Sequence, residues 1–240
     1  MFLVAVFLVA ILSGATATVV GFGIGSLMTP LLAIKFGTTT AVALVTLPHA
    51  AATAVRCWRL RADVNRTVLV RFGLLSAAGA LAGALIYTRL GPGTLTRVLG
   101  GLLLLTAAAQ LTGWASRWHP HGPLVALFGR ASGFFGGIAG NQGGLRSAAL
   151  TAFGLPPLGF VATATATGLL VDAARTPVYV WYSGPVLLTL WAPIILATVG
   201  VLIGTIAGER MLLRLSTRRF GQAIGGAIGA LGIWMLVMPV

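Results

Sequence analysis

The stretch from residue 21 to residue 32 reads GFGIGSLMTPLL, and three of its first five residues are glycine. A second glycine-rich stretch, residues 136–144, reads GGIAGNQGG. Both interrupt long apolar regions at a point where a regular helix would otherwise continue, because glycine weakens helices and tolerates positive φ. Irregular backbone at membrane depth is found only where protein or a water-filled cavity covers it. We therefore interpret both stretches as chain breaks that mark a transport site.

The composition indicates whether the chain folds in water or in a lipid bilayer. Of its 240 residues, 58% are hydrophobic and only 8% are charged, against about 25% charged in an average soluble domain. A water-soluble globular domain would need more surface charge than 16 basic and 3 acidic residues supply. We predict an all-α polytopic membrane protein that lies in a lipid bilayer.

The net charge of +13 does not indicate a nucleic-acid partner. The basic residues collect in short loops between apolar runs, which is typical of cytoplasmic loops of membrane proteins, and there is no basic stripe with aromatic residues for stacking. The single Cys57 has no CxxC partner, and His119 and His121 alone are too few for a metal site. We expect no nucleic acid, no cofactor and no metal.

The first apolar run ends in Ala15-Thr16-Ala17, which resembles a signal-peptide cleavage site. A signal peptide begins with a positively charged region, which is absent here, and residues 13–32 recur later in the chain. We expect this segment to remain part of the fold.

Apolar runs define the expected path through the membrane. Two of them, at 24–34 and 145–155, hold about 11 residues, or about 16 Å of helix at 1.5 Å per residue, which is half of a hydrocarbon core of about 30 Å. These two are predicted half-helices. The other runs are 2–20, 38–55, 68–88, 95–114, 124–140, 158–182, 185–207 and 220–238.

An internal repeat relates the two halves, which we place at residues 1–114 and 123–240. One common offset aligns Gly14, Gly21 and Gly25 with Gly133, Gly140 and Gly144, and after a two-residue gap Gly37 and Thr46 align with Gly154 and Thr163. Each half then has a glycine-broken re-entrant hairpin followed by three transmembrane helices. An odd number of crossings inverts the second copy relative to the first, as in many secondary transporters.

The basic loops predict the orientation. We expect the two densest basic loops, and Arg117 with them, in the cytoplasm. One loop holds Arg56, Arg59, Arg61 and Arg66, and the other holds Arg210, Arg214, Arg218 and Arg219. The sparsely charged loops around Lys35, Arg89 and Ser183 are expected outside.

The sequence resembles the TauE/SafE family, membrane proteins that export sulfite and organosulfonates. The likeness covers nearly the whole chain and rests on residues 21–32, 41–46, 133–144, 153–156 and 162–163. Where the family has three adjacent glycines, this chain has Gly23-Ile24-Gly25 and Gln142-Gly143-Gly144, and the proline expected after the second copy is replaced near Ala149. The resemblance implies a small sulfur oxyanion or sulfonate as the cargo.

The chemistry of the residues independently allows an anion. Helix N-termini at glycine turns present unpaired N–H groups and the positive end of the helix dipole. The alternative is that the glycines only allow helices to pack closely, which explains most of the 33 glycines. The candidate substrate-binding residues are Gly21, Gly23, Gly25, Thr46, His49, Asn141, Gln142, Gly143, Gly144, Arg146 and Thr163.

Arg146 begins the second half-helix, near the midplane, where a charge costs about 2.5–3.5 kcal/mol on insertion scales. A bound oxyanion offsets this cost through two charge-assisted hydrogen bonds, whereas the alternative is a side chain that extends to the membrane interface. Asn141 and Gln142 either donate to the anion or cap the half-helix.

Asp172 is the sole acid within an apolar run, and Arg175 follows it at i+3. The pair is either a local ion pair or a proton-coupling device. His49, next to Pro48, either attracts the anion when protonated or is a structural histidine at a proline kink. Threonines at 46 and 163 either line a polar path or bond to the preceding helical turn.

The expected function is a secondary transporter of small sulfur-containing anions, with export favoured by the resemblance. An enzyme is not expected, because neither GxSxG nor HExxH occurs in the sequence. A passive anion channel is the main alternative. We expect a multi-pass protein of the bacterial inner membrane, and the sequence does not decide between a monomer and a homodimer.

Overall fold

The computed structural model describes residues 1–114, 122–141, 143–212 and 217–237, and all regular secondary structure in this part of the chain is helical, without strands. Seven of its helices are long and apolar enough to cross a membrane. The prediction of an all-α polytopic membrane protein is confirmed at this level.

The helices follow the apolar runs of the sequence. Proline occupies the first turn of three of them, at Pro92, Pro123 and Pro157, where its missing N–H removes no hydrogen bond. The elements are α1 (Phe2–Val20), α2 (Ile24–Arg59), α3 (Arg66–Val68), a π-helical turn (Leu69–Gly73), α4 (Leu74–Tyr87), α5 (Pro92–Thr112), α7 (Pro123–Ala139), α8 (Gly143–Leu150), α9 (Pro157–Thr189), α10 (Trp191–Leu212) and α11 (Thr217–Val237), with short 3₁₀ turns at Arg61–Asp63 and Thr151–Phe153.

Glycines end α1 and α7 at the two chain breaks that the sequence predicts. Gly21 terminates α1 and Gly140 terminates α7, both in the left-handed region at φ 88° and 71°. The non-helical Gly37, at φ 74°, divides α2 into a short first part and a long second part. Gly154, at φ 57°, separates the segment that begins with α8 from α9. Both predicted half-helices are therefore separated from the following long helix by a left-handed glycine.

Two helix pairs have very close backbones. In the α1–α10 pair, Gly14 faces the backbone of Val201 and Gly204 faces the carbonyl of Ile11, so closely that a Cβ at either glycine would overlap the partner. The α4–α7 pair repeats the arrangement, with Gly133 against the carbonyl of Ser76. Close packing through small residues is thus the role of these glycines.

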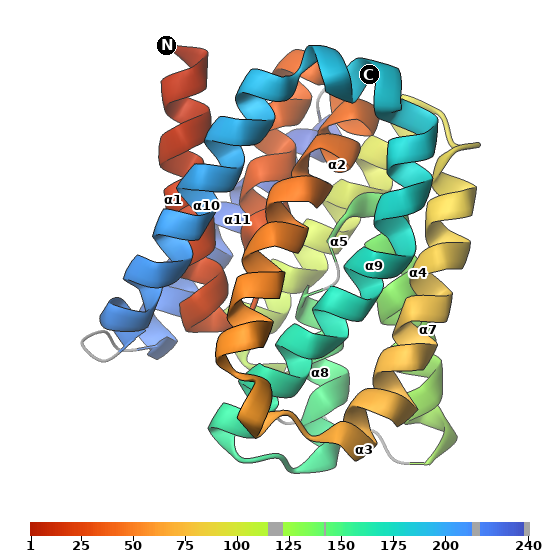
Figure 1. The fold of residues 1–240 in the computed structure, drawn as a ribbon, viewed down its shortest axis with the longest axis vertical. Coiled ribbons are helices and arrows are strands. Elements are labelled where there is room, and N and C mark those ends of the chain that lie inside the picture. The colour runs from red at the N-terminus through yellow and green to blue at the C-terminus, as the bar shows by residue number, and fades with distance from the viewer. Residues whose placement is uncertain (115–121, 142, 213–216, 238–240) are drawn as a thin grey trace.

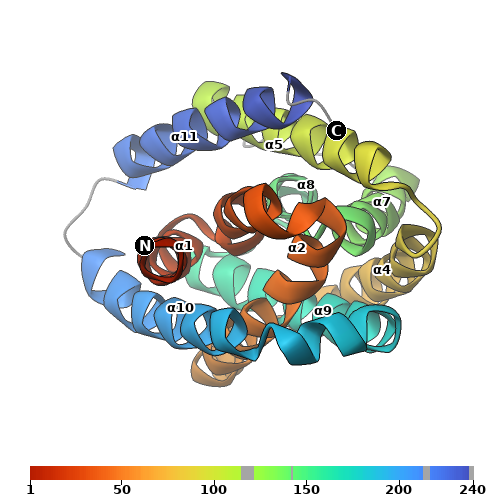
Figure 2. The same ribbon diagram turned by 90° about the horizontal axis from the view of Figure 1, so that it is seen from above.

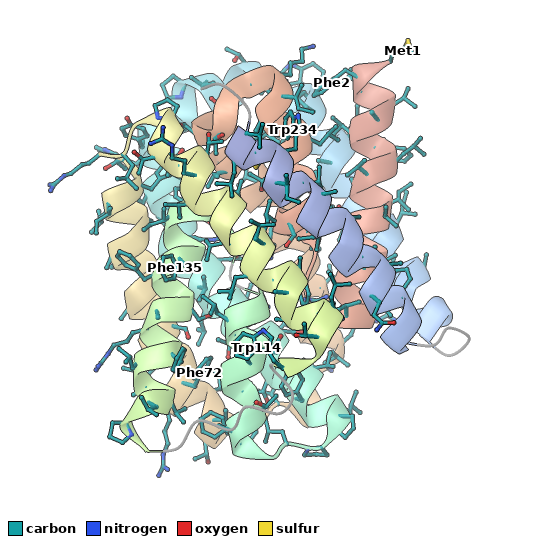
Figure 3. The ribbon with its side chains drawn as sticks, turned by 180° about the vertical axis from the view of Figure 1, so that it is seen from behind. Met1, Phe2, Phe72, Trp114, Phe135 and Trp234 are labelled. Carbon is teal, nitrogen blue, oxygen red and sulfur yellow. The ribbon has the colours of Figure 1, made fainter. Side chains whose placement is uncertain are left out.

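The helices form layers that enclose the chain breaks. Figure 2 shows α5 beside α11 on one side of the molecule and α9 with α10 on the other, while α1, the first part of α2, α7 and α8 lie between them. Figure 3 shows the α5–α11 face, with Trp234 of α11 near one end of the molecule and Phe72 near the other. The breaks are therefore screened from lipid on both sides.

The start of α1 and the end of α11 lie at the same end of the molecule, and α3 lies at the opposite end (Figures 1 and 3). Two boundaries differ from the expected ones. We predicted a loop around Ser183, but α9 continues through Gly184 and Pro185 to Thr189, and the turn is at Leu190.

Helix α2 also continues past the expected end at residue 55, to Arg59. Arg56 and Arg59 therefore belong to the last helical turn, where cations interact favourably with the negative end of the helix dipole.

Candidate functional site

The two chain breaks touch each other. A side chain at Gly25 would meet the carbonyl oxygen of Gly140, and a side chain at Gly143 would overlap Phe22. Ser26 donates a hydrogen bond across the contact to Oδ1 of Asn141, at 3.2 Å. Helices α2 and α8 therefore begin at the same place in the interior of the protein.

A small cavity lies at this contact. Its volume is about 20 Å³, which is roughly the room that one water molecule needs. The first N–H groups of a helix have no partner within that helix, and residues from the first turns of α2 and α8 line the cavity. The lining residues are Ala17, Gly21, Phe22, Gly23, Ile24, Gly25, His49, Arg56, Gly140, Asn141, Gly143 and Arg146.

Arg146 is a buried cation without a hydrogen-bond partner at two of its nitrogens. Its residue is 3% exposed, and Nε and Nη1 are both buried and unbonded in the described part of the chain. Gly168 of α9 provides the room, because a Cβ there would come within 2.8 Å of Nη1. The side chain thus turns inward toward the cavity and does not extend to the membrane surface.

Asn141 has one satisfied group and one unsatisfied group. Its Oδ1 accepts from Ser26, while its Nδ2 is buried and makes no hydrogen bond to any described residue. Buried polar groups in proteins are nearly always paired. Two side chains that line the same cavity therefore both present unpaired donors, and donors of this kind match an oxyanion.

Asp172 connects three helices. Arg175 donates to Oδ1 of Asp172 from Nε at 3.1 Å and from Nη2 at 2.8 Å, and also to the carbonyl of Gly136 in α7 at 2.6 Å. His49 of α2 lies with Nδ1 2.7 Å from Oδ2 of the same carboxylate. The expected ion pair on α9 is present, and its extension to His49 was not predicted.

Arg56 lines the cavity although the sequence analysis placed it in a cytoplasmic loop. It is 5% exposed and donates to the carbonyl of Ala17, in the last turn of α1. A signal for this position exists in the sequence: His49, Thr53 and Arg56 follow the i, i+4, i+7 spacing of one helical face. On that face His49 contacts Asp172 of α9 and Arg56 contacts Ala17 of α1.

Of the predicted binding residues, Gly21, Gly23, Gly25, His49, Asn141, Gly143 and Arg146 line the cavity. Three others do not. Thr46 donates to the carbonyl of Val42 one turn earlier, Thr163 accepts from the backbone N–H of Asn65, and Gly144 packs against Thr106.

The remaining predicted residue, Gln142, lies outside the described residues, as do Arg117, His119 and His121. Within the described residues, no three His, Cys, Asp or Glu side chains form a cluster that would hold a metal ion.

Comparison with known proteins gives one result. Residues 6–235 match the family described as "Sulfite exporter TauE/SafE", which is nearly the whole chain. Neither a curated protein nor a solved structure matches the chain.

Proposed function

Because the chain belongs to the TauE/SafE family of sulfite exporters, a family of membrane transporters, we propose that it is a secondary transporter that exports sulfite or an organosulfonate across the bacterial inner membrane. The anion binds in the cavity between the two chain breaks. The observation that carries this proposal is the pair of unpaired buried donors, Arg146 and Asn141, at one cavity.

The electrostatics of the cavity support an anionic cargo. Arg56 and Arg146 both line it, and the helix N-termini beginning at Ile24 and Gly143 add the positive ends of two helix dipoles. The nearest carboxylate, Asp172, is already bonded to Arg175 and His49. A guanidinium and backbone amides together provide the geometry that an oxygen-rich anion needs.

Helix pairing supports two inverted repeats, residues 1–114 and 123–240. If the two parts of α2 are counted separately, each half has five segments, and the first segment of each half packs against the fourth segment of the other half: α1 against α10, and α7 against α4. The third segments of the two halves pair with each other, α2 with α9, and so do the fifth segments, α5 with α11. Glycines aligned by the sequence repeat, such as Gly37 and Gly154, share a positive φ.

The cavity is too small for the anion in this conformation, so the proposed transport requires the site to open. A volume of about 20 Å³ holds about one water molecule, whereas sulfite has four heavy atoms. A carrier passes through closed states in which the site is reached from neither side, and the two breaks must separate to admit the anion. Rocking of one repeat against the other would separate them.

Counterflow into proteoliposomes tests the proposal. Vesicles loaded with unlabelled sulfite should accumulate radiolabelled sulfite transiently above equilibrium, because a carrier exchanges one anion for another. Arg146→Ala should abolish this uptake, whereas the exposed Arg97→Ala should leave it intact. A panel of sulfite, sulfate, taurine, sulfoacetate and acetate identifies the cargo. Equilibration without overshoot would indicate a channel, and no sulfite flux in either assay would contradict the proposal.

A further inference from the structure

His49 lies at the boundary between two parts of the site. Its ring lines the anion cavity, and its Nδ1 is 2.7 Å from Oδ2 of Asp172. The residue has no other contact within hydrogen-bond distance in the described part of the chain except Thr53 Oγ1, at 3.3 Å from the same Nδ1. Of the two ring nitrogens, Nε2 is the one that makes no hydrogen bond to a described residue.

The Asp172–Arg175 pair determines which nitrogen of His49 carries a proton. Two N–H groups of Arg175 bond to Oδ1 of Asp172, and charge-assisted bonds of this kind favour the ionised carboxylate. An ionised carboxylate only accepts hydrogen bonds, so Nδ1 of His49 must donate. In the neutral ring Nε2 then has a lone pair directed away from Asp172, and in the protonated ring it has an N–H.

These two forms of His49 respond oppositely to an anion. A lone pair at Nε2 repels a sulfite oxygen, whereas an N–H donates to it. The other charges around the ring are Arg146 on α8, Asp172 and Arg175 on α9, and Arg56 on α2 itself. An anion in the cavity offsets the field of the arginines that line it and so removes a penalty on a further positive charge.

We propose that His49 takes up one proton at Nε2 when the anion binds, and that Asp172, held by Arg175, is the positioning residue that keeps Nε2 toward the cavity. This inference rests on the proposed anion site and names a property of it, proton-linked binding. Linkage is reciprocal, so the proton strengthens anion binding as much as the anion strengthens proton binding.

The test compares sulfite binding to the full-length protein in detergent between about pH 5 and pH 8, where histidine ordinarily changes charge. Sulfite itself titrates in this range, so the quantity to read is the ratio of Kd for a variant to Kd for the wild type at each pH. The protonation of free sulfite at each pH is the same in both samples and therefore cancels in this ratio. Two variants are needed: His49→Gln, whose amide reaches toward the cavity, and His49→Asn, whose amide donates to Asp172.

For one linked proton the ratio should change by up to roughly tenfold per pH unit across the titration of His49, with the wild type favoured at low pH. Sulfite binding in weakly buffered solution should also remove protons in excess of those explained by sulfite, and only in the wild type. A purely structural histidine would change the ratio equally at every pH, and that result would overturn the inference.

The outcomes separate the inference from the proposed function. In one outcome the wild-type protein binds sulfite, the Arg146→Ala variant does not, and the ratio of Kd values is independent of pH for both His49 variants. The anion site is then supported and the proton linkage is wrong. If wild-type protein binds no sulfur oxyanion at any pH, the proposed function itself fails and the linkage fails with it.

Discussion

Gly25 lies so close to the carbonyl oxygen of Gly140 that no side chain fits between them. The two residues are far apart in the chain, yet each belongs to a glycine-rich break, and their contact brings the N-termini of α2 and α8 to one cavity. The hydrogen bond from Ser26 to Asn141 crosses the same contact. The closed site therefore depends on direct contact between the two backbones, and only glycine leaves room for that contact here.

Gly25→Ala should reduce sulfite transport strongly while the protein still folds, because the added methyl group forces the two breaks apart. The matched control is Gly101→Ala, a helical glycine on α5 with open space around its Cα. That substitution should be neutral or stabilising by about 0.5–1 kcal/mol, since alanine is the better helix former. Transport initial rates and melting temperatures of both variants are the measurements, and normal transport by Gly25→Ala would contradict the described contact.

Arg146→Met should raise the stability of the protein without substrate and abolish stabilisation by sulfite. The reason is that Arg146 is buried with two unpaired nitrogens, and an uncompensated charge in the membrane costs at least about 2.5–3.5 kcal/mol. Arg97→Met on the exposed face of α5 should change neither property. Thermal unfolding in detergent, with and without sulfite, measures both effects. Lower stability of Arg146→Met without substrate would indicate a structural role instead.

Local features of the fold were predictable from the sequence, and long-range contacts were not. The breaks at Gly21 and Gly140 and the division at Gly37 follow from glycine placed within apolar runs, which is a local signal. The hydrogen bond between His49 and Asp172 joins different helices, and no periodicity reports which helices become neighbours. The position of Arg56 was predicted wrongly, because an arginine that follows an apolar run can occupy the last turn of the helix as well as the loop after it.

Gly133→Val should destabilise the protein by about 1–3 kcal/mol, since it inserts a side chain against the backbone of Ser76 in the α4–α7 pair. Gly204→Val should do the same in the α1–α10 pair, where the glycine faces Ile11. Similar losses at both positions are expected if the pairs are equivalent parts of two repeats. The exposed Gly226→Val on α11 is the control for a β-branched residue in a helix, and unfolding by denaturant gives the comparison.

Cysteine labelling should place position 61 in the cytoplasm and position 89 outside. Both arginines are exposed in turns on opposite sides of the apolar span Arg66–Tyr87, which ends with α4, and cytoplasmic loops have the excess of basic residues. Arg61→Cys and Arg89→Cys are made separately in a Cys57→Ser background and treated in intact cells with a membrane-impermeant maleimide. Only position 89 should react before lysis. Reaction of both from outside would contradict the crossing of α4.

The last prediction distinguishes an ion pair from a proton carrier at Asp172. Asp172→Asn leaves Arg175 buried at 1% exposure without its carboxylate, and breaking a buried pair in this way costs about 3–5 kcal/mol. The variant should therefore unfold at lower temperature. Asp172→Asn combined with Arg175→Gln removes both charges and keeps an amide that donates to the carbonyl of Gly136, so the double variant should recover much of the loss.

A double-mutant cycle on thermal stability, with Arg175→Gln alone as the fourth member, gives the coupling between the two residues. A proton carrier predicts a different pattern: Asp172→Asn would mimic the protonated acid, fold normally and exchange sulfite without responding to an imposed pH gradient. Stability and gradient-driven transport must be measured on the same preparation, because an unstable protein loses transport for either reason. A fully stable Asp172→Asn variant would contradict the ion-pair role, and a variant that still responds fully to an imposed pH gradient would contradict proton transfer through Asp172.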